Sequence, residues 1–177
     1  LGSATSSVAM LHVTPQAPYF VLIPIGGSVG TGSSHTFIGL ANGSQPISYQ
    51  WQHAGTNLPG ATLASLTLNN LGLNDGGNYT LLASNAVNIS TSPVAQLTVY
   101  QNPTFLQPLT NQVVDVGNSM TLSVNAVGSP TLAYAWQLNG LPLTNSNSSL
   151  IITNISLVQS GYYRVTVTNQ YGSISST

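Results

Sequence analysis

The chain has 177 residues, and only three of them carry a formal charge: Asp75, Asp115 and Arg164. An average soluble domain has roughly a quarter of its residues charged, so the polarity of this chain comes instead from its 23 Ser, 19 Thr and 17 Asn. A nucleic-acid-binding surface needs clustered Lys and Arg, and a calcium site needs several carboxylates, so this composition excludes both.

The remaining composition narrows the class of protein further. The chain contains no Cys, which excludes disulfides and thiol chemistry. No apolar run approaches the roughly 18 residues of a membrane span, so we expect no membrane insertion. A surface of Ser, Thr, Asn and Gly predicts an extracellular or cell-surface protein, and it fits a secreted bacterial or archaeal source.

The first element along the chain is an apolar stretch that we call the N-terminal segment. It is identical to residues 94–99 at four of six positions, and a proline follows each stretch. Residues 94–99 end the first of two similar units of about 85 residues in the chain. The N-terminal segment therefore resembles the last strand of such a unit. Its members are Val8, Ala9, Met10, Leu11, His12 and Val13.

Short stretches with period-two alternation follow, separated by Gly, Asn and Pro turns. They predict strands at residues 36–41, 47–53, 65–69, 79–84 and 94–99. No stretch of ten residues has convincing helical periodicity. The fold class is therefore predicted to be all-β, and strands at this spacing favour a sandwich.

A second copy of the same unit follows the first. Trp136 repeats Trp51 at an offset of 85, and Tyr163 repeats Tyr79 at an offset of 84. The tryptophans resemble the strand-C tryptophan of immunoglobulin-like domains, and the run Asp75-x-Gly77-x-Tyr79 resembles the tyrosine corner of that family. The second copy has Gln159 in place of the acid.

The chain thus resembles two cysteine-free immunoglobulin-like domains of the I-set kind. The resemblance implies a domain over residues 15–100 and another over residues 101–177, preceded by residues 1–14 as a separate N-terminal strand. It places Gly39, Leu81, Val124 and Val165 where the family usually has its cystines. The predicted structural core is Trp51, Tyr79, Leu81, Trp136, Tyr163 and Val165.

The two ends of the chain are out of phase with the repeat. The second domain ends where its strand G is expected to begin, so we predict that it lacks a strand G of its own. Supplying that strand would bury Ala9, Leu11 and Val13, by analogy with residues 95, 97 and 99. The hypothesis is that the N-terminal segment of one subunit completes the second domain of the next by strand addition. The alternatives are a window cut from a longer repeat array and a segment that folds back within its own chain.

Candidate catalytic chemistry is sparse, because acid-base work usually needs paired carboxylates or a His beside a nucleophile. Asp75 and Asp115 fit turns, and Arg164 fits a strand surface. His12, His35 and His53 lack the spacing of a zinc site. We therefore predict no enzyme activity, no catalytic, metal-binding or cofactor-binding residues, and no cofactor. Five sequons are glycosylation candidates: Asn42, Asn78, Asn88, Asn147 and Asn154.

These observations favour an extracellular structural subunit that polymerises head-to-tail into a filament, with copies of itself as partners and with no nucleic-acid partner. Near-zero net charge suits self-association. The alternative is an adhesion or carbohydrate-binding immunoglobulin-like module within a larger repetitive cell-surface protein, with glycans as further partners.

Overall fold

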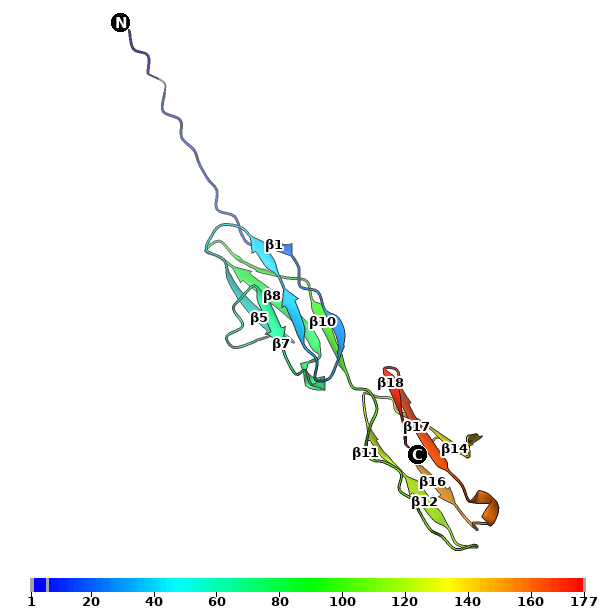
Figure 1. Cartoon of the computed structure of the whole chain (residues 1–177). Helices are drawn as coiled ribbons and strands as arrows, with labels where there is room; N and C mark the ends of the chain where they lie inside the picture. Colours follow the sequence, from blue (N-terminus) through cyan, green and yellow to red (C-terminus); the bar gives the residue numbers. More distant parts are fainter. Residues whose placement is uncertain (1, 6, 177) are drawn as a thin grey trace. The chain divides into compact units, whose positions relative to one another are not determined.

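The computed structural model describes residues 2–5 and 7–176. The chain folds into two compact units (Figure 1). One unit comprises Leu1–Gly27, Ser34–Asn69 and Gly76–Thr98, and the other comprises Ser28–Ser33, Asn70–Asp75 and Val99–Thr177. The domain boundaries after residues 14 and 100 stay predictions.

By backbone pairing, the strands up to Tyr100, β2 included, build a first sandwich. The longer sheet has the order β2-β10-β8-β5-β6 with β9 also paired to β8, and the pairs β1-β4 and β3-β7 complete the sandwich. A short 3-10 turn, η1 (Leu73–Asp75), precedes β8. The strands are β1 (Tyr19–Leu22), β2 (Gly27–Gly30), β3 (His35–Ile38), β4 (Leu40–Asn42), β5 (Ser48–His53), β6 (Thr56–Asn57), β7 (Ser65–Leu68), β8 (Gly77–Ser84), β9 (Ile89–Thr91) and β10 (Ala95–Tyr100).

The core of the first sandwich is centred on Trp51, which is fully buried. Its ring lies 5.7 Å from that of Phe37, and its Nε1 donates a hydrogen bond to the Leu63 carbonyl at 2.9 Å. At the positions of the family's cystine, Gly39 leaves room for the buried Leu81, because a Cβ on Gly39 would lie 2.7 Å from Leu81 Cδ2. Side-chain packing therefore replaces the absent disulfide.

The second sandwich repeats this plan. Its strand order is β15-β14-β17-β18, and the pairs β11-β13 and β12-β16 complete it. A second 3-10 turn, η2 (Leu157–Gln159), precedes β17. The strands are β11 (Thr104–Gln107), β12 (Met120–Ser123), β13 (Asn125–Val127), β14 (Ala133–Leu138), β15 (Leu141–Leu143), β16 (Ser149–Ile152), β17 (Tyr163–Asn169) and β18 (Gly172–Ser176).

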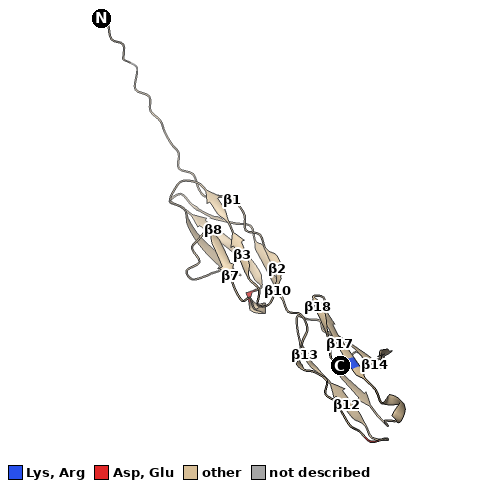
Figure 2. Cartoon of the chain, in the orientation of Figure 1, with Lys and Arg blue, Asp and Glu red and all other residues tan. Residues whose placement is uncertain are grey.

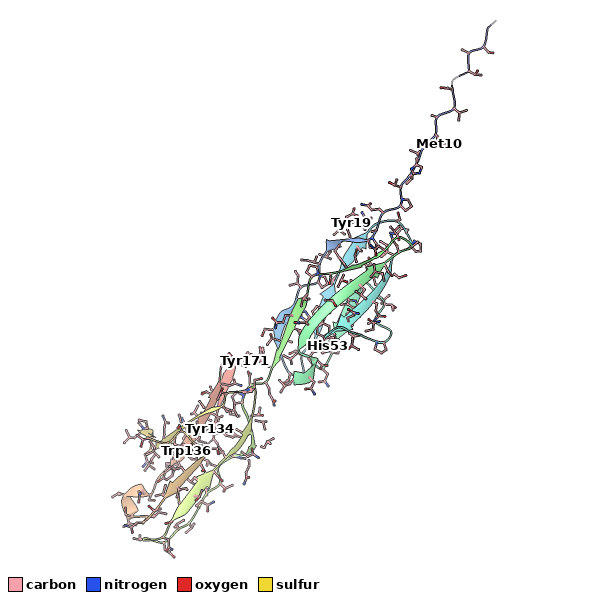
Figure 3. All side chains as sticks on the ribbon, turned by 180° about the vertical axis from the view of Figure 1, so that it is seen from behind. Met10, Tyr19, His53, Tyr134, Trp136 and Tyr171 are labelled. Atoms are coloured by element: carbon pink, nitrogen blue, oxygen red, sulfur yellow. The ribbon has the colours of Figure 1, made fainter. Side chains whose placement is uncertain are left out.

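The predicted core of the second sandwich is largely interior. Trp136 and Val165 are buried, and Trp136 Nε1 donates to the Asn147 carbonyl at 2.9 Å as Trp51 does to Leu63. Tyr163 departs from the expectation, since it is only half-buried and packs against the edge of the core. Figure 3 shows Trp136 and Tyr134 within this sandwich.

The all-β class and the tandem immunoglobulin-like sandwiches are confirmed, but the expectation for strand G needs a correction. β18 pairs with β17 from Asn169↔Gly172 to Val165↔Ser176, so the second domain carries the beginning of the strand that was predicted to be missing. The error has a physical cause: residues 173–176 are mostly Ser, and their weak hydrophobic alternation conceals a strand that backbone pairing and the turn before it determine.

The N-terminal segment forms no strand within the chain (Figure 1). Its large apolar side chains are exposed, from 75 % at Val13 to 99 % at Val8. A segment folded back onto one of its own domains would bury these side chains, so the structure does not support that alternative.

Candidate functional site: a strand slot in the second sandwich

The first sandwich shows how strand β10 is held. β10 lies between β8 and β2, with Ala95 opposite Tyr79 and Leu97 opposite Gly77. Its alternate residues Ala95, Leu97 and Val99 are buried, while Gln96 and Thr98 are exposed. β10 therefore closes one edge of the core.

The second sandwich has an open groove at the corresponding place. Residues 111–116 correspond to β2 but form no strand, and no described strand lies between them and residues 161–163 at the start of β17. The groove between these two edges has a volume of about 340 Å³. We call it the strand slot, and it lies where the counterpart of β10 would run.

Apolar side chains line the floor of the strand slot. They include Leu109, Met120, Leu122, Ile152 and Ile155. Ile155 is only half-buried, whereas its counterpart in the first sandwich, Leu71, is 2 % exposed. The core at this edge is therefore less covered than the corresponding edge of the first sandwich.

Tyr163 stands at one side of the strand slot. Its phenolic Oη donates a hydrogen bond to the Gln159 carbonyl at 2.8 Å, the contact expected of a tyrosine corner. Burial raises the pKa of the Tyr163 phenol above its ordinary value. Its counterpart Tyr79 in the first sandwich is 2 % exposed.

The turn before this tyrosine explains why Gln159 replaces the expected acid. Asp75 Oδ2 accepts a hydrogen bond from the Gly72 backbone N–H at 2.7 Å in the first sandwich. Gln159 Oε1 accepts the equivalent bond from the Ser156 N–H at 2.9 Å in the second. A side-chain oxygen is required at this position, and it needs no charge.

His35 and His53 both lie against aromatic rings. His35 lies edge-on to Phe37, with ring centroids 4.5 Å apart, and His53 stacks on Tyr79 at 4.4 Å. Within residues 2–5 and 7–176, no group of three His, Cys, Asp or Glu could hold a metal ion. Asp115 and Arg164 are exposed, and Figure 2 shows how little charge the domains carry.

The sequon asparagines are all exposed, which is compatible with modification but does not show it. They are Asn42, Asn78, Asn88, Asn147 and Asn154.

Sequence reasoning missed one pair of structural residues, Asn85 and Asn169. Asn169 Oδ1 accepts hydrogen bonds from the N–H groups of Tyr171 and Gly172, and its Nδ2 donates to the carbonyls of Gln101 and Ser129. Asn85 Nδ2 donates in the same way to the carbonyls of Gln16 and Ser44. The signal that could have revealed them is their repetition at an offset of 84, one of the motifs that both copies share.

Comparison with known proteins agrees with this geometry. Residues 103–177 match the immunoglobulin I-set domain family. The fold and the repeated tryptophans and tyrosines define a tandem of immunoglobulin-like sandwiches, of which the second matches the I-set family.

Among curated relatives, the chain is 29 % identical over 94 % of its length to the human cell adhesion molecule DSCAM, and it covers 9 % of that protein. It is 30 % identical over 96 % of its length to mouse hemicentin-1, of which it covers 3 %. The chain therefore spans a small part of each relative. The expected extracellular or cell-surface location is confirmed by the similarity to cell-surface adhesion proteins. A bacterial or archaeal source remains a prediction.

Solved structures support the tandem fold. The I-band fragment I67–I69 from titin aligns with 93 % of this chain and 64 % of its own, at 27 % identity and a TM-score of 0.59. The four N-terminal immunoglobulin domains of Dscam1 align with 95 % of this chain and 46 % of their own, at 20 % identity and a TM-score of 0.71, which shows the shared fold alone. No helix among the described residues is long and apolar enough to cross a membrane.

Proposed function

We propose that this tandem is an adhesive module of a larger cell-surface protein and binds copies of itself. The observation that carries the proposal is its similarity along nearly the whole chain to a cell adhesion molecule. The absence of candidate catalytic or metal-binding clusters within residues 2–5 and 7–176 is compatible with a binding role.

One face of the first sandwich supports self-association. Leu22 on β1 lies opposite Leu40 on β4, and both side chains are exposed, as is Ile38 on β3. The equivalent pair in the second sandwich is Gln107 opposite Asn125, which is polar. An uncharged apolar face can meet the same face of a second copy without like-charge repulsion.

Bead aggregation tests this adhesive role. Beads coated with the chain should aggregate, and Leu40→Asn, which copies the residue of the second sandwich, should reduce aggregation several-fold. Asn125→Ser on the polar face is the matched control and should leave aggregation unchanged. Dispersed wild-type beads, or equal aggregation by the Leu40→Asn variant, would contradict homophilic adhesion through this face.

Carbohydrate binding is the other form of the adhesive proposal. A sugar-binding platform needs exposed aromatic rings. Tyr100 and Tyr171 stack on each other with ring centroids 4.3 Å apart, so each covers one face of the other. Tyr162 is 87 % exposed and remains available. Calorimetric titration with a panel of glycans separates the two forms, since heat of binding to a glycan would favour sugar recognition.

The likeness of residues 8–13 to residues 94–99 favours a second candidate, a filament subunit that assembles head-to-tail. Here the N-terminal segment of one copy adds a strand to the second domain of the next. Such a contact is heterologous, so it closes into a ring or grows as a filament. Electron microscopy should show polymers that disappear when residues 1–13 are deleted, and polymers that survive the deletion would refute this candidate.

A further inference from the structure

We propose that Asn42 is a modification site: its side-chain amide closes onto the backbone nitrogen of Gly43, loses ammonia and leaves a carboxylate on the apolar face of the first sandwich. The effect of this charge on adhesion rests on the function proposed above, whereas the chemistry at Asn42 is independent of it.

Asn42 ends β4, and its side chain lies against the nitrogen with which it would react. The Gly43 N–H donates a hydrogen bond to Asn42 Oδ1 at 2.8 Å. Cγ is bonded directly to Oδ1, so the Gly43 nitrogen lies next to the carbon that it would attack. Ring closure between two groups held this close needs little further ordering of the chain.

Gly43 is unhindered, and the fold does not allow another residue in its place. Its φ is +146°, and a Cβ at this position would lie 2.9 Å from the Ala17 carbonyl oxygen. The backbone of the neighbouring segment therefore excludes a side chain here, and the attacking nitrogen has no Cβ beside it. The turn after β4 requires glycine, so the Asn-Gly pair is a consequence of the fold.

The reaction balances with water and a base as its co-reactants. The base removes the proton from the Gly43 nitrogen, the bond from this nitrogen to Cγ forms, and the bond from Cγ to Nδ2 breaks with release of ammonia. Water then opens the resulting succinimide ring. Opening at Cγ gives an aspartyl side chain, and opening at the backbone carbonyl gives an isoaspartyl linkage. Both products carry a negative charge.

Two other asparagines each lack one half of this arrangement. Asn88 Oδ1 accepts the N–H of the next residue at 2.8 Å, as at Asn42, but that residue is Ile89, whose branched Cβ crowds the nitrogen. Asn139 is followed by glycine, but its Oδ1 accepts the Tyr162 N–H at 2.9 Å instead. Of these three asparagines, Asn42 combines the unhindered nitrogen with the close contact.

The new charge would lie on the face that we propose to be adhesive. Exposure alternates along this part of the chain: Ile38, Leu40 and Asn42 are exposed, whereas the residues between them are buried. Tyr19 of β1 lies opposite Asn42 and is 44 % exposed, and Figure 3 labels it on the first sandwich. In a face-to-face contact, a carboxylate at position 42 would lose its hydration without a cationic partner, because the single Arg of the chain lies in the second sandwich.

A second modification would act on the same atom. Residues 42–44 form a sequon, and a glycan would be attached to Asn42 Nδ2, which is the nitrogen that leaves as ammonia. A glycan at Asn42 therefore blocks the ring closure. The tests below use the full chain produced without N-glycans.

The first test incubates the chain in mildly alkaline buffer and follows each asparagine by mass spectrometry. Conversion at Asn42 should be at least about tenfold faster than at Asn88, because Ile89 crowds the nitrogen there. Replacing Ile89 with Gly should raise the rate at Asn88. Conversion at Asn42 should also exceed that at Asn139 in the native chain, and the two rates should become similar in denaturant. No conversion at Asn42, or equal native rates at Asn42 and Asn139, would overturn the proposal.

The second test repeats the bead aggregation with fresh and incubated chain. Incubated wild-type beads should aggregate several-fold less than fresh ones. Asn42→Gln should aggregate equally before and after incubation, because its longer side chain closes only into a larger, less favoured ring. Asn42→Asp should reproduce the loss without incubation, and Asn125→Asp, which adds the same charge to the second sandwich, should not. Full aggregation by wild-type chain that is converted at Asn42 would overturn the effect on adhesion.

The two measurements separate this inference from the proposed function. If fresh wild-type beads stay dispersed while Asn42 converts at the expected rate, the adhesive function fails and the modification site stands. If fresh beads aggregate and Asn42 does not convert, the adhesive function stands and the modification site fails.

Discussion

Asn169 shows how one uncharged side chain can organise several backbone segments. It contacts the turn between β17 and β18, the Gln101 carbonyl and the Ser129 carbonyl with both ends of its amide. Only an amide of this length offers an acceptor and two donors together. Asn85 repeats the arrangement, so the fold uses amides where many proteins use charged groups.

We expect Asn169→Asp to destabilise the chain by about 2 kcal/mol or more, because a carboxylate oxygen would face two carbonyl oxygens in place of the donating Nδ2. The measurement is the free energy of unfolding by denaturant at pH 7. Asn125→Asp, at an exposed position on β13, is the control and should change this free energy by less than about 0.5 kcal/mol. If the two variants lose similar amounts of the free energy of unfolding, the hydrogen bonds of the Asn169 amide do not contribute as proposed.

Tyr163 should make the second sandwich less stable as the pH rises in the alkaline range. Burial raises the pKa of its phenol above 10.0, so the folded state favours the neutral form. The contribution of the neutral Tyr163 phenol to the free energy of unfolding is complete below pH 10.0. It is lost as the pH rises through the raised pKa.

Replacing Tyr163 with Phe should flatten the fall in the free energy of unfolding above pH 10.0, since the ionising group is gone. At pH 7 the variant should lose about 1 kcal/mol with its hydrogen bond to Gln159. Tyr162→Phe, at the exposed neighbour, should keep the wild-type profile. Chemical denaturation between pH 7 and 11 provides the measurement, and an unchanged alkaline slope for Tyr163→Phe would refute the assignment.

At the scale of elements, β17 and the N-terminal segment differ in how their backbones are paired. β17 lies between β14 and β18, and Arg164 on it lies opposite Gln137 of β14. The N-terminal segment pairs with no strand of its own chain. A protease needs an unpaired, extended backbone, so the two elements should differ sharply in susceptibility.

Trypsin should leave the native chain intact, although Arg164 is exposed, because cleavage there requires β17 to unfold locally. His12→Lys introduces a site in the unpaired N-terminal segment and should be cleaved at least about tenfold faster than Arg164. Mass spectrometry of timed digests measures both rates. Rapid loss of the second domain in the wild-type chain would contradict the pairing of β17.

At the scale of the whole molecule, the near absence of charge is the dominant property. The formal net charge is −1, from two Asp and one Arg, and Figure 2 colours these few charged residues on the ribbon. Long-range electrostatic repulsion between copies is therefore negligible. Association through apolar faces or shared strands meets no charge barrier.

Salt should consequently have little effect on self-association below the concentrations at which salts act on the hydrophobic effect. We expect the association constant to change less than about twofold when NaCl rises from about 0.02 to 0.5 M, because screening acts only on charges. Analytical ultracentrifugation of the wild-type chain checks this. A steep loss of association with salt would indicate that Asp75, Asp115 or Arg164 contributes to the interface.

The sequence by itself determined the all-β class, the two copies and the positions of the buried tryptophans, because periodic apolar residues and repeated motifs encode strands and cores directly. It could not predict β18, because the Ser-rich residues of β18 have little hydrophobic alternation and form a strand by pairing with β17. It also missed the contacts of Asn169, which join backbone groups far apart in the sequence. Only the tertiary structure showed that Ile155 and Tyr163 are half-buried, because the exposure of a side chain depends on which strands cover it.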